Sequence, residues 1–180
     1  VYHVRFQGVG PDGVFYRSPD FNFKTPALEP SVLGVGRVGG ENLALRENGA
    51  RVVGVSSNYG GNSNDSVYGA EKAFDGVLST EWSSDGDGDA AWIELQLGGE
   101  ARVSRVGFRT RTMGSSARIY VFRIITDDDQ SYGPFTLKGV DAVEQFPVDF
   151  VAKRLRFEAV ETNGGNTGAV EIEVYGKLVS

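Results

Sequence analysis

Short runs of alternating apolar and polar residues dominate the chain. Gly, Asn or Asp breaks these runs every 8 to about 12 residues, a spacing typical of β-sandwiches and β-barrels. The runs are rich in Val, Ile, Phe and Tyr, which suit a pleated, half-buried strand. The pattern therefore predicts strands at residues 2–9, 13–23, 50–57, 91–97, 105–110, 117–126, 131–137, 153–160 and 169–176.

The segment VDFVAKRLRFEAVE is the one ambiguous stretch in this pattern. Val148, Val151 and Leu155 fit a helical stripe, but Leu155, Phe157 and Ala159 alternate with charged residues,. We interpret the segment as a strand. Many strands without intervening helices favour antiparallel pairing, because parallel strands need long crossover connections. The predicted fold class is an all-β antiparallel β-sandwich with an N-terminal β-hairpin.

Residues 1–33 form the predicted hairpin segment, in which two aromatic runs flank the turn sequence GPDG,. This segment resembles the last two strands of a fibronectin type III domain, and it is too short to bury a core of its own. It is interpreted as a possible remnant of a preceding β domain.

Residues 34–41 are a glycine-rich stretch in which Gly34, Gly36 and Gly39 have the GxGxxG spacing of a phosphate loop,. The following helical pattern is only about two turns long, and no acidic residue stands after Val55 to bind a ribose. A flexible linker is therefore favoured, followed by a main domain at residues 42–177.

Charge and composition exclude several functions. The chain carries 18 Lys and Arg against 24 Asp and Glu, a net charge of −6, which repels nucleic acid and makes an anionic membrane an unlikely partner,. The absence of cysteine excludes disulfides, thiolate catalysis and cysteine zinc sites,. His3 is the single histidine, and no nucleophile motif is present, so an enzyme is not expected,. A carboxylate pair acting on a glycosidic bond remains an alternative.

Four ordered motifs identify a family: NLALRENGARVVGVSSNY, GAEKAFDGVLSTEWSS, AWIELQLG and AVEIEVYG. They resemble the discoidin or coagulation factor 5/8 type C superfamily, which has a galactose-binding-like jelly roll, and in particular the bacterial family 32 carbohydrate-binding modules. Animal members usually contain a disulfide, so the lack of cysteine favours the bacterial branch.

The resemblance implies a non-catalytic carbohydrate-binding module of a larger protein, secreted or at the cell surface, that binds a polysaccharide or glycan beside other domains of the parent chain. The alternatives are a discoidin-type adhesion or membrane-recognition or protein-recognition module, and a purely structural spacer.

The stretch around Asp75 is a candidate calcium site, because hard cations take six to eight oxygen ligands, a count that tight loops supply. Asp75 offers charge, Gly76 permits the turn, Thr80 adds a hydroxyl, and Glu171 arrives if the chain ends pack together,. The resemblance implies a structural Ca²⁺ with carbonyl ligands at matching positions. The alternative is an Asp-Gly turn capped by its own side chain. The expected metal set is Lys72, Asp75, Val77, Thr80, Val170 and Glu171.

Four polar loops, residues 56–69, 83–89, 109–118 and 161–168, are expected to meet at one end of the sandwich and to bind the sugar,. A sugar site needs a flat aromatic ring and a few fixed hydrogen-bonding groups. The candidate ligand-binding residues are Asn58, Tyr59, Asn62, Arg109, Arg111, Arg118, Asn163 and Asn166.

Arg109 and Arg111 share a strand parity opposite to that of Val106 and Phe108, so they face outward together if the apolar pair faces the core,. The resemblance implies that an arginine at the end of this strand contacts the sugar. A guanidinium grips a carboxylate through two hydrogen bonds, which suggests a uronic acid in the ligand. Solvated surface arginines are the alternative. By the same resemblance, both tryptophans are expected in the core.

Overall fold

The structure is a computed structural model that describes residues 2–4, 7–9, 11, 14–17, 21–23, 40–114 and 116–179. The chain divides into two compact units, residues 1–38 and 39–180. Of the predicted linker at 34–41, only Gly40 and Glu41 lie within the described residues.

The N-terminal unit contains two antiparallel strand pairs. Strand β1 (Tyr2–Val4) pairs with β4 (Phe21–Phe23), and β2 (Gln7–Val9) pairs with β3 (Phe15–Arg17). In this unit the outer strands β1 and β4 pair with each other, and so do the inner strands β2 and β3. This nested pairing matches the hairpin that the sequence pattern predicts.

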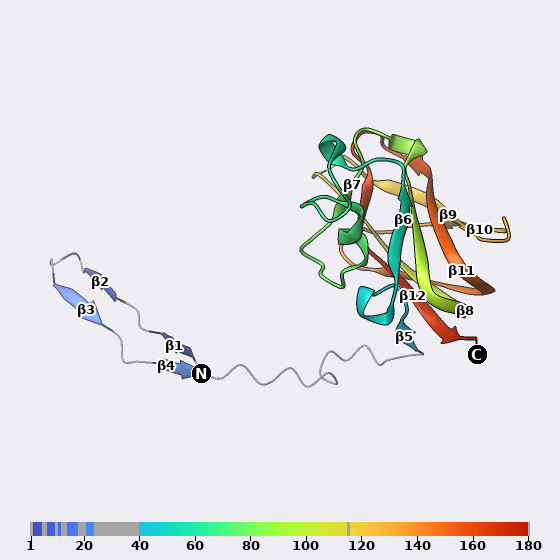
Figure 1. Cartoon of the computed structure of the whole chain (residues 1–180). Coiled ribbons are helices and arrows are strands. Elements are labelled where there is room, and N and C mark those ends of the chain that lie inside the picture. Colours follow the sequence, from blue (N-terminus) through green and yellow to red (C-terminus); the bar gives the residue numbers. More distant parts are fainter. Residues whose placement is uncertain are drawn as a thin grey trace. The chain divides into compact units, whose positions relative to one another are not determined.

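The second unit is built on two long antiparallel strands (Figure 1). β8 (Trp92–Thr110) and β11 (Glu144–Thr162) each span 19 residues and pair along most of their length. Among the described residues they belong to an eight-stranded sheet in the order β10-β9-β11-β8-β12-β5, with β6 paired to β8 and β7 to β12. The other strands are β5 (Glu41–Asn42), β6 (Arg51–Val55), β7 (Trp82–Ser83), β9 (Ile119–Thr126), β10 (Ser131–Thr136) and β12 (Gly168–Leu178).

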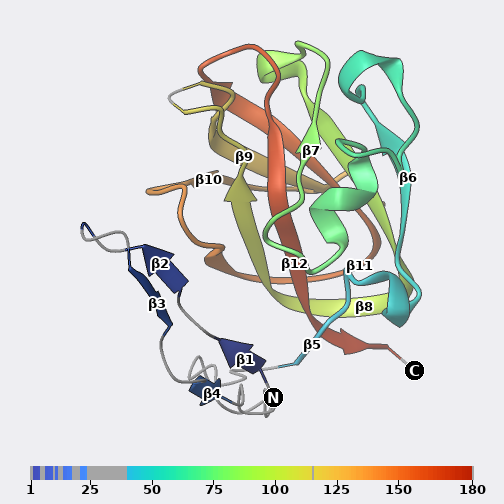
Figure 2. The same ribbon diagram turned by 90° about the vertical axis from the view of Figure 1, so that its left-hand side faces the viewer.

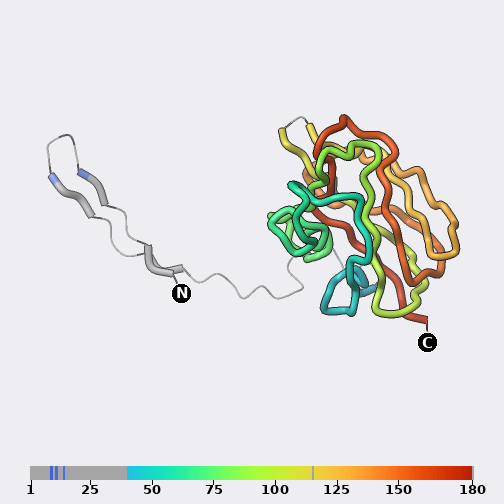
Figure 3. The backbone as a smooth tube through the Cα atoms, turned by 45° about the horizontal axis from the view of Figure 1, so that its top comes forward, coloured from blue at the N-terminus to red at the C-terminus, as the bar shows by residue number. Residues whose placement is uncertain are grey.

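The long strands bend, and the sheet therefore folds over itself into two layers (Figures 2 and 3). The first part of β8, up to Gln96, lies between β6 and the end of β11, whereas its second part, from Ala101, lies between β12 and the start of β11. Gly98 and Gly99 of β8 lie in the stretch that is skipped in the pairing with β11, where the register shifts between Ala152 and Arg154; a second shift lies between Pro147 and Phe150. Register shifts of this kind bend a strand and increase its twist.

The core lies between the two layers and follows the period of two in the sequence. Ile93, Leu95 and Leu97 of β8 are buried, as are Phe108 and Phe122, whose rings stack 4.5 Å apart. The predicted antiparallel β-sandwich is confirmed, and the ambiguous segment at 148–161 is a strand.

Helical structure within the described residues is limited to the 3₁₀ turns η1 (Arg46–Asn48), η2 (Tyr59–Gly61), η3 (Ala70–Phe74) and η4 (Gly88–Ala90). None of the helices in this part of the chain has the length and apolar character required to cross a membrane.

Two local expectations are wrong. The strands predicted at 91–97 and 105–110 are one strand, because pairing with β11 resumes after the two glycines. Trp82 is buried in the core, but Trp92 has the opposite strand parity to buried Ile93 and is only half-buried. The guanidinium of Arg156 lies 3.9 Å from the centre of the Trp92 ring, so a cation covers this indole,.

Candidate functional site

The loop after η3 is organised around Asp75. The carboxylate accepts a hydrogen bond from the Val77 amide at 3.0 Å, and the Thr80 hydroxyl lies 2.9 Å from each of its oxygens. The same hydroxyl lies 2.8 Å from the Val77 carbonyl. Gly76 has a φ of 72°, which a side chain would strain,. The loop is therefore a self-capped Asp-Gly turn that gathers several oxygen atoms.

Glu171 of β12 is buried beside this loop. The residue is 1% exposed, and neither carboxylate oxygen has a hydrogen-bond partner. Burial, and after it the charges of Asp75 and Glu173, raise the pKa of Glu171 to about 8. The amides of Gly76 and Val77 lower this pKa in part, although they do not reach hydrogen-bond geometry. The two predicted carboxylates are thus neighbours, and that of Glu171 has no hydrogen-bond partner.

The residue before Glu171 is positioned by a bulge. Ala169 pairs with Thr110 of β8 and Glu171 with Arg109, so Val170 is the extra residue between them. A bulged residue is left out of the ladder, which allows its carbonyl to point elsewhere.

The oxygen atoms of this region fit a hard cation, since two carboxylates, a hydroxyl and backbone carbonyls are the ligands that calcium prefers. Within the described residues no group of three or more acidic or imidazole side chains could hold a metal. A cation here would depend on hydroxyl and carbonyl oxygens in addition to Asp75 and Glu171.

The four polar loops meet at one end of the sandwich (Figure 1). The Ser57 hydroxyl donates to Asp87 at 2.6 Å, and the Gly88 amide donates to the Gly165 carbonyl at 3.1 Å. The amide of Arg118 donates to the Asn163 side-chain oxygen at 2.7 Å. These bonds join loops that are distant in the sequence into one surface.

Arg111 is the fixed polar centre of this end. Its side chain is 7% exposed; Nε donates to Glu81 at 3.0 Å, and Nη1 donates to the Asn166 carbonyl at 2.8 Å. The guanidinium lies 5.9 Å from the ring centre of Tyr68, which is 41% exposed. Tyr59 meets Tyr68 edge to face, with ring centres 5.9 Å apart. Two exposed aromatic rings therefore stand beside a held ion pair.

The expectation that Arg109 and Arg111 face outward together is wrong. β8 ends at Thr110, so strand alternation does not extend to Arg111, which turns into the loop cluster. Arg109 remains in the strand, and its Nε donates to the Val140 carbonyl at 2.9 Å.

The predicted asparagines play different parts. Asn58 is buried and holds its own loop: its amide donates to the Asn62 carbonyl and to Asn64, and its oxygen accepts from the Ala70 amide. The Asn62 side chain donates to the Tyr59 carbonyl. Asn163 is exposed on the surface of its loop.

Arg118 is half-buried, and its guanidinium lies 5.2 Å from the ring centre of Tyr120. Tyr68 and Glu81 are site residues that the sequence analysis did not select. Tyr68 lies inside a predicted loop, and Glu81 directly precedes the buried Trp82. Their pairing with Arg111 needs the fold, because the residues are far apart in the sequence.

A two-layer antiparallel sandwich with loops gathered at one end is the architecture of the galactose-binding-like jelly rolls. The sequence profile of the F5/8 type C domain matches residues 53–174, and the chain belongs to this family. No curated protein sequence matches the chain.

Solved structures share this fold. The family 32 carbohydrate-binding module of Clostridium perfringens NanJ, in complex with galactose, is 20% identical with a TM-score of 0.58, over 70% of this chain and 93% of that one. Chitosan-binding module 1 from a chitosanase/glucanase of Paenibacillus sp. IK-5 is 26% identical with a TM-score of 0.53, over 76% of this chain and 99% of that one.

A family 89 glycoside hydrolase from C. perfringens is 25% identical over 73% of this chain, with a TM-score of 0.56. The match covers 14% of that hydrolase, so the similar domain is a small part of a larger enzyme.

Proposed function

We propose that this chain is a non-catalytic carbohydrate-binding module that binds a polysaccharide or glycan through its end loops. The observation that carries the proposal is the exposed ring of Tyr68 beside Arg111, which Glu81 holds at 3.0 Å. An aromatic face accepts the apolar C–H face of a sugar, and fixed charged groups bond its hydroxyls.

The ion pair gives this site its polar specificity. Because Arg111 is already held by Glu81 and the Asn166 carbonyl, little side-chain entropy is lost when a ligand binds,. Glu81 can accept from one sugar hydroxyl, and the guanidinium can donate to another. A site that is lined with oriented donors and acceptors rejects sugars whose hydroxyls point elsewhere.

The charge of Arg111 is balanced by Glu81, so an acidic ligand would rely on other arginines. Within the part of the chain that the structure describes, Arg109 and Arg118 have no ion-pair partner. They are the residues proposed to meet the carboxylate of a uronic acid, and a comparison of uronans with neutral galactans tests this class.

A structural Ca²⁺ is the second part of the proposal. Asp75 and Glu171, the Thr80 hydroxyl and the carbonyls of Lys72, Val77 and Val170 would hold it. The ion would supply the positive charge that two adjacent carboxylates lack. The buried, unpaired oxygens of Glu171 support this assignment.

The parent protein is proposed to be a larger secreted or cell-surface protein, since the similar domain of the family 89 hydrolase is one part of an enzyme.

A discoidin-type recognition surface is the second candidate function. Val67 is 75% exposed and Met113 56% exposed on the end loops, and exposed apolar side chains favour contact with a lipid or a protein,.

A glycan microarray with the full chain tests the proposal, followed by affinity electrophoresis of Tyr68→Ala. Binding should fall by about tenfold, a loss of about 1.4 kcal/mol, because the ring that accepts the sugar face is removed. Tyr175→Ala removes a tyrosine that packs on Arg105 elsewhere on β12, and it should leave binding unchanged. An array without hits, together with binding to phosphatidylserine vesicles, would replace the proposal by the second candidate.

A further inference from the structure

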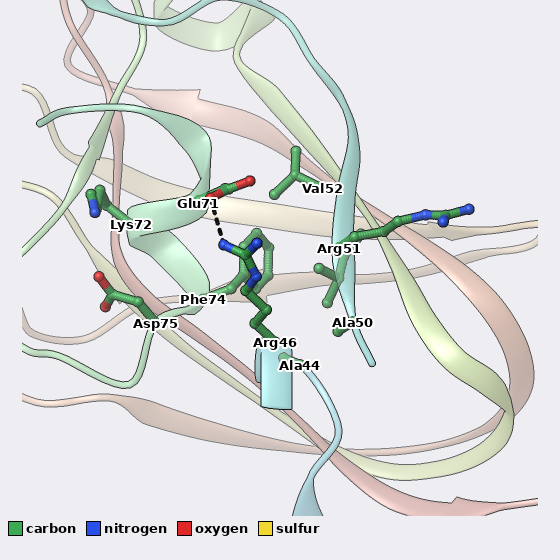
Figure 4. Close-up of a pocket in the computed structure, with 10 residues that line it drawn as sticks. Ala44, Arg46, Ala50, Arg51, Val52, Glu71, Lys72, Phe74 and Asp75 are labelled. Atoms are coloured by element: carbon green, nitrogen blue, oxygen red, sulfur yellow. Dashed lines mark ion pairs between the residues drawn. The ribbon is translucent and has the colours of Figure 1, made fainter. Parts of the chain in front are cut away.

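A hollow, here called the side hollow, lies on the side of the sandwich between η1, β6 and η3 (Figure 4). Its volume is about 240 Å³, and it shares no lining residue with the end-loop site. The floor is apolar and buried, formed by Ala44, Ala50, Phe74 and Leu95. Two of these four side chains are single methyl groups, which leaves the space open to a small apolar body.

Arg46 crosses the mouth of this hollow in front of Phe74 and reaches Glu71 (Figure 4). The ion pair is 3.7 Å long, and the side chains of Arg46 and Glu71 are 89% and 42% exposed. An exposed pair of this kind contributes about 0 to 1 kcal/mol. Arg46 can therefore exchange Glu71 for another anion at little cost.

The other rim charges leave an excess of positive charge. Arg51 and Lys72 are the remaining cations, and Asp75 is the remaining acid. Asp75 is bonded within its own loop by Val77 and Thr80, and it points away from the hollow in Figure 4. Arg46, Arg51 and Lys72 outnumber Glu71 and Asp75 by one among the lining residues. Arg51 and Lys72 also extend away from the hollow in Figure 4, so Arg46 is the cation that would meet a negatively charged ligand at the mouth,.

A neighbouring hollow of about 480 Å³ shares Arg46, Phe74 and Asp75 with the side hollow. Its remaining lining residues are Leu45, Glu47 and Gly76. The guanidinium of Arg46 therefore has open space around it, and a ligand longer than the side hollow has room to extend.

We propose that this hollow binds a small amphipathic carboxylate. The apolar body lies on Ala44, Ala50 and Leu95, and the carboxylate takes two hydrogen bonds from the guanidinium of Arg46 in place of Glu71. The site is independent of sugar binding, since it uses none of the end-loop residues.

The ligand chemistry is tested by a two-dimensional amide NMR titration of the full chain with 4-phenylbutyrate. Saturable shifts are expected at the amides of Ala44, Ala50 and Val52. The uncharged analogue 4-phenylbutan-1-ol should bind about tenfold more weakly, because it lacks the charge-assisted contact. Shifts confined to other residues, the absence of saturation, or tighter binding of the amine 4-phenylbutylamine would overturn the proposal.

Variants separate the charge from the apolar floor. Arg46→Gln should weaken binding about tenfold, whereas Arg102→Gln, which removes an exposed arginine paired with Asp149, should not,. Glu71→Gln removes the competing anion and should tighten binding of the carboxylate; weaker binding would contradict the proposed exchange. Ala50→Leu fills the hollow and should abolish binding. Ala50→Leu also risks overpacking. If this variant does not fold, Arg46→Gln and Glu71→Gln decide the outcome.

Discussion

The carboxylate of Glu171 is buried next to that of Asp75, and neither of its oxygens has a hydrogen-bond partner. Burial first, and then the charges of Asp75 and Glu173, raise the pKa of Glu171 to about 8. A folded protein without metal must therefore keep a proton on this side chain over much of the neutral range.

The metal-free protein should become less stable as pH rises. In the unfolded chain Glu171 ionises near 4.5, whereas in the folded protein it ionises near 8. Between these two pH values the folded state binds one proton more than the unfolded chain does. The contribution of this proton to the free energy of unfolding is therefore full below about pH 4.5 and is lost as the pH rises to about 8. Melting temperatures measured in EGTA at pH 5, 6.5 and 8 should fall in that order.

Glu171→Gln is the control for this dependence, because its neutral amide has no proton to lose. Its melting temperature in EGTA should vary less between pH 5 and pH 8 than that of the parent chain. Equal slopes in the two proteins would assign the dependence to other groups.

Calcium should stabilise the protein at neutral pH. A ligand at 100 times its dissociation constant contributes about 2.7 kcal/mol, which corresponds to several degrees of melting temperature for a domain of this size. Excess EGTA should remove this gain, and Asp75→Ala should mimic EGTA because it deletes a ligand charge. A melting curve that does not respond to EGTA, from protein in which elemental analysis finds no metal, would refute the site.

Arg111→Ala should impair both stability and sugar binding. It removes the partner of Glu81 and the donor to the Asn166 carbonyl, at a cost of about 2 kcal/mol, since Glu81 is left partly buried without a counterion,. Calorimetry and affinity electrophoresis measure the two effects. Arg118→Ala breaks no ion pair among the described residues and should leave the melting temperature nearly unchanged.

If Arg118 meets an acidic sugar, its loss should weaken uronan binding more than galactan binding. Equal losses for both polymers would remove the acidic-ligand class, while leaving the sugar site at Tyr68 in place.

The sequence predicts the sandwich well, because burial of one face imposes a period of two that can be read from residues such as Ile93, Leu95 and Leu97,. It also places Asp75 and Glu171 together on the condition that the chain ends pack side by side, whereas the carbonyl ligands and the calcium come only from the family resemblance. The orientation of Arg111 could not be predicted, since it depends on where β8 stops and on the distant Glu81.

The exposure of Trp92 was also missed. Parity places it opposite Ile93, but which parity faces the core at a strand end depends on the partner strands. The side hollow has no pattern in the sequence, because two alanines and a loose ion pair are ordinary until the fold brings them together.

Gly168 sets the spacing between β12 and β7, and its substitution should affect the sugar site through packing. A Cβ atom at this position would lie 2.0 Å from the Trp82 carbonyl oxygen, so Gly168→Ala has to push the two strands apart. We expect a loss of about 3 kcal/mol, as for an overpacked core. Gly139→Ala is the matched control, because its nearest contact would be an ordinary 3.9 Å.

The Gly168 carbonyl accepts a hydrogen bond from the Arg111 amide at 3.0 Å, so movement of β12 also shifts the residue that anchors the ion pair with Glu81. Gly168→Ala should therefore weaken sugar binding even at temperatures well below its melting point. Calorimetry measures the loss of stability, and affinity electrophoresis at 4 °C measures the loss of sugar binding. Full binding by a destabilised Gly168→Ala protein would show that the sugar site does not depend on this strand contact.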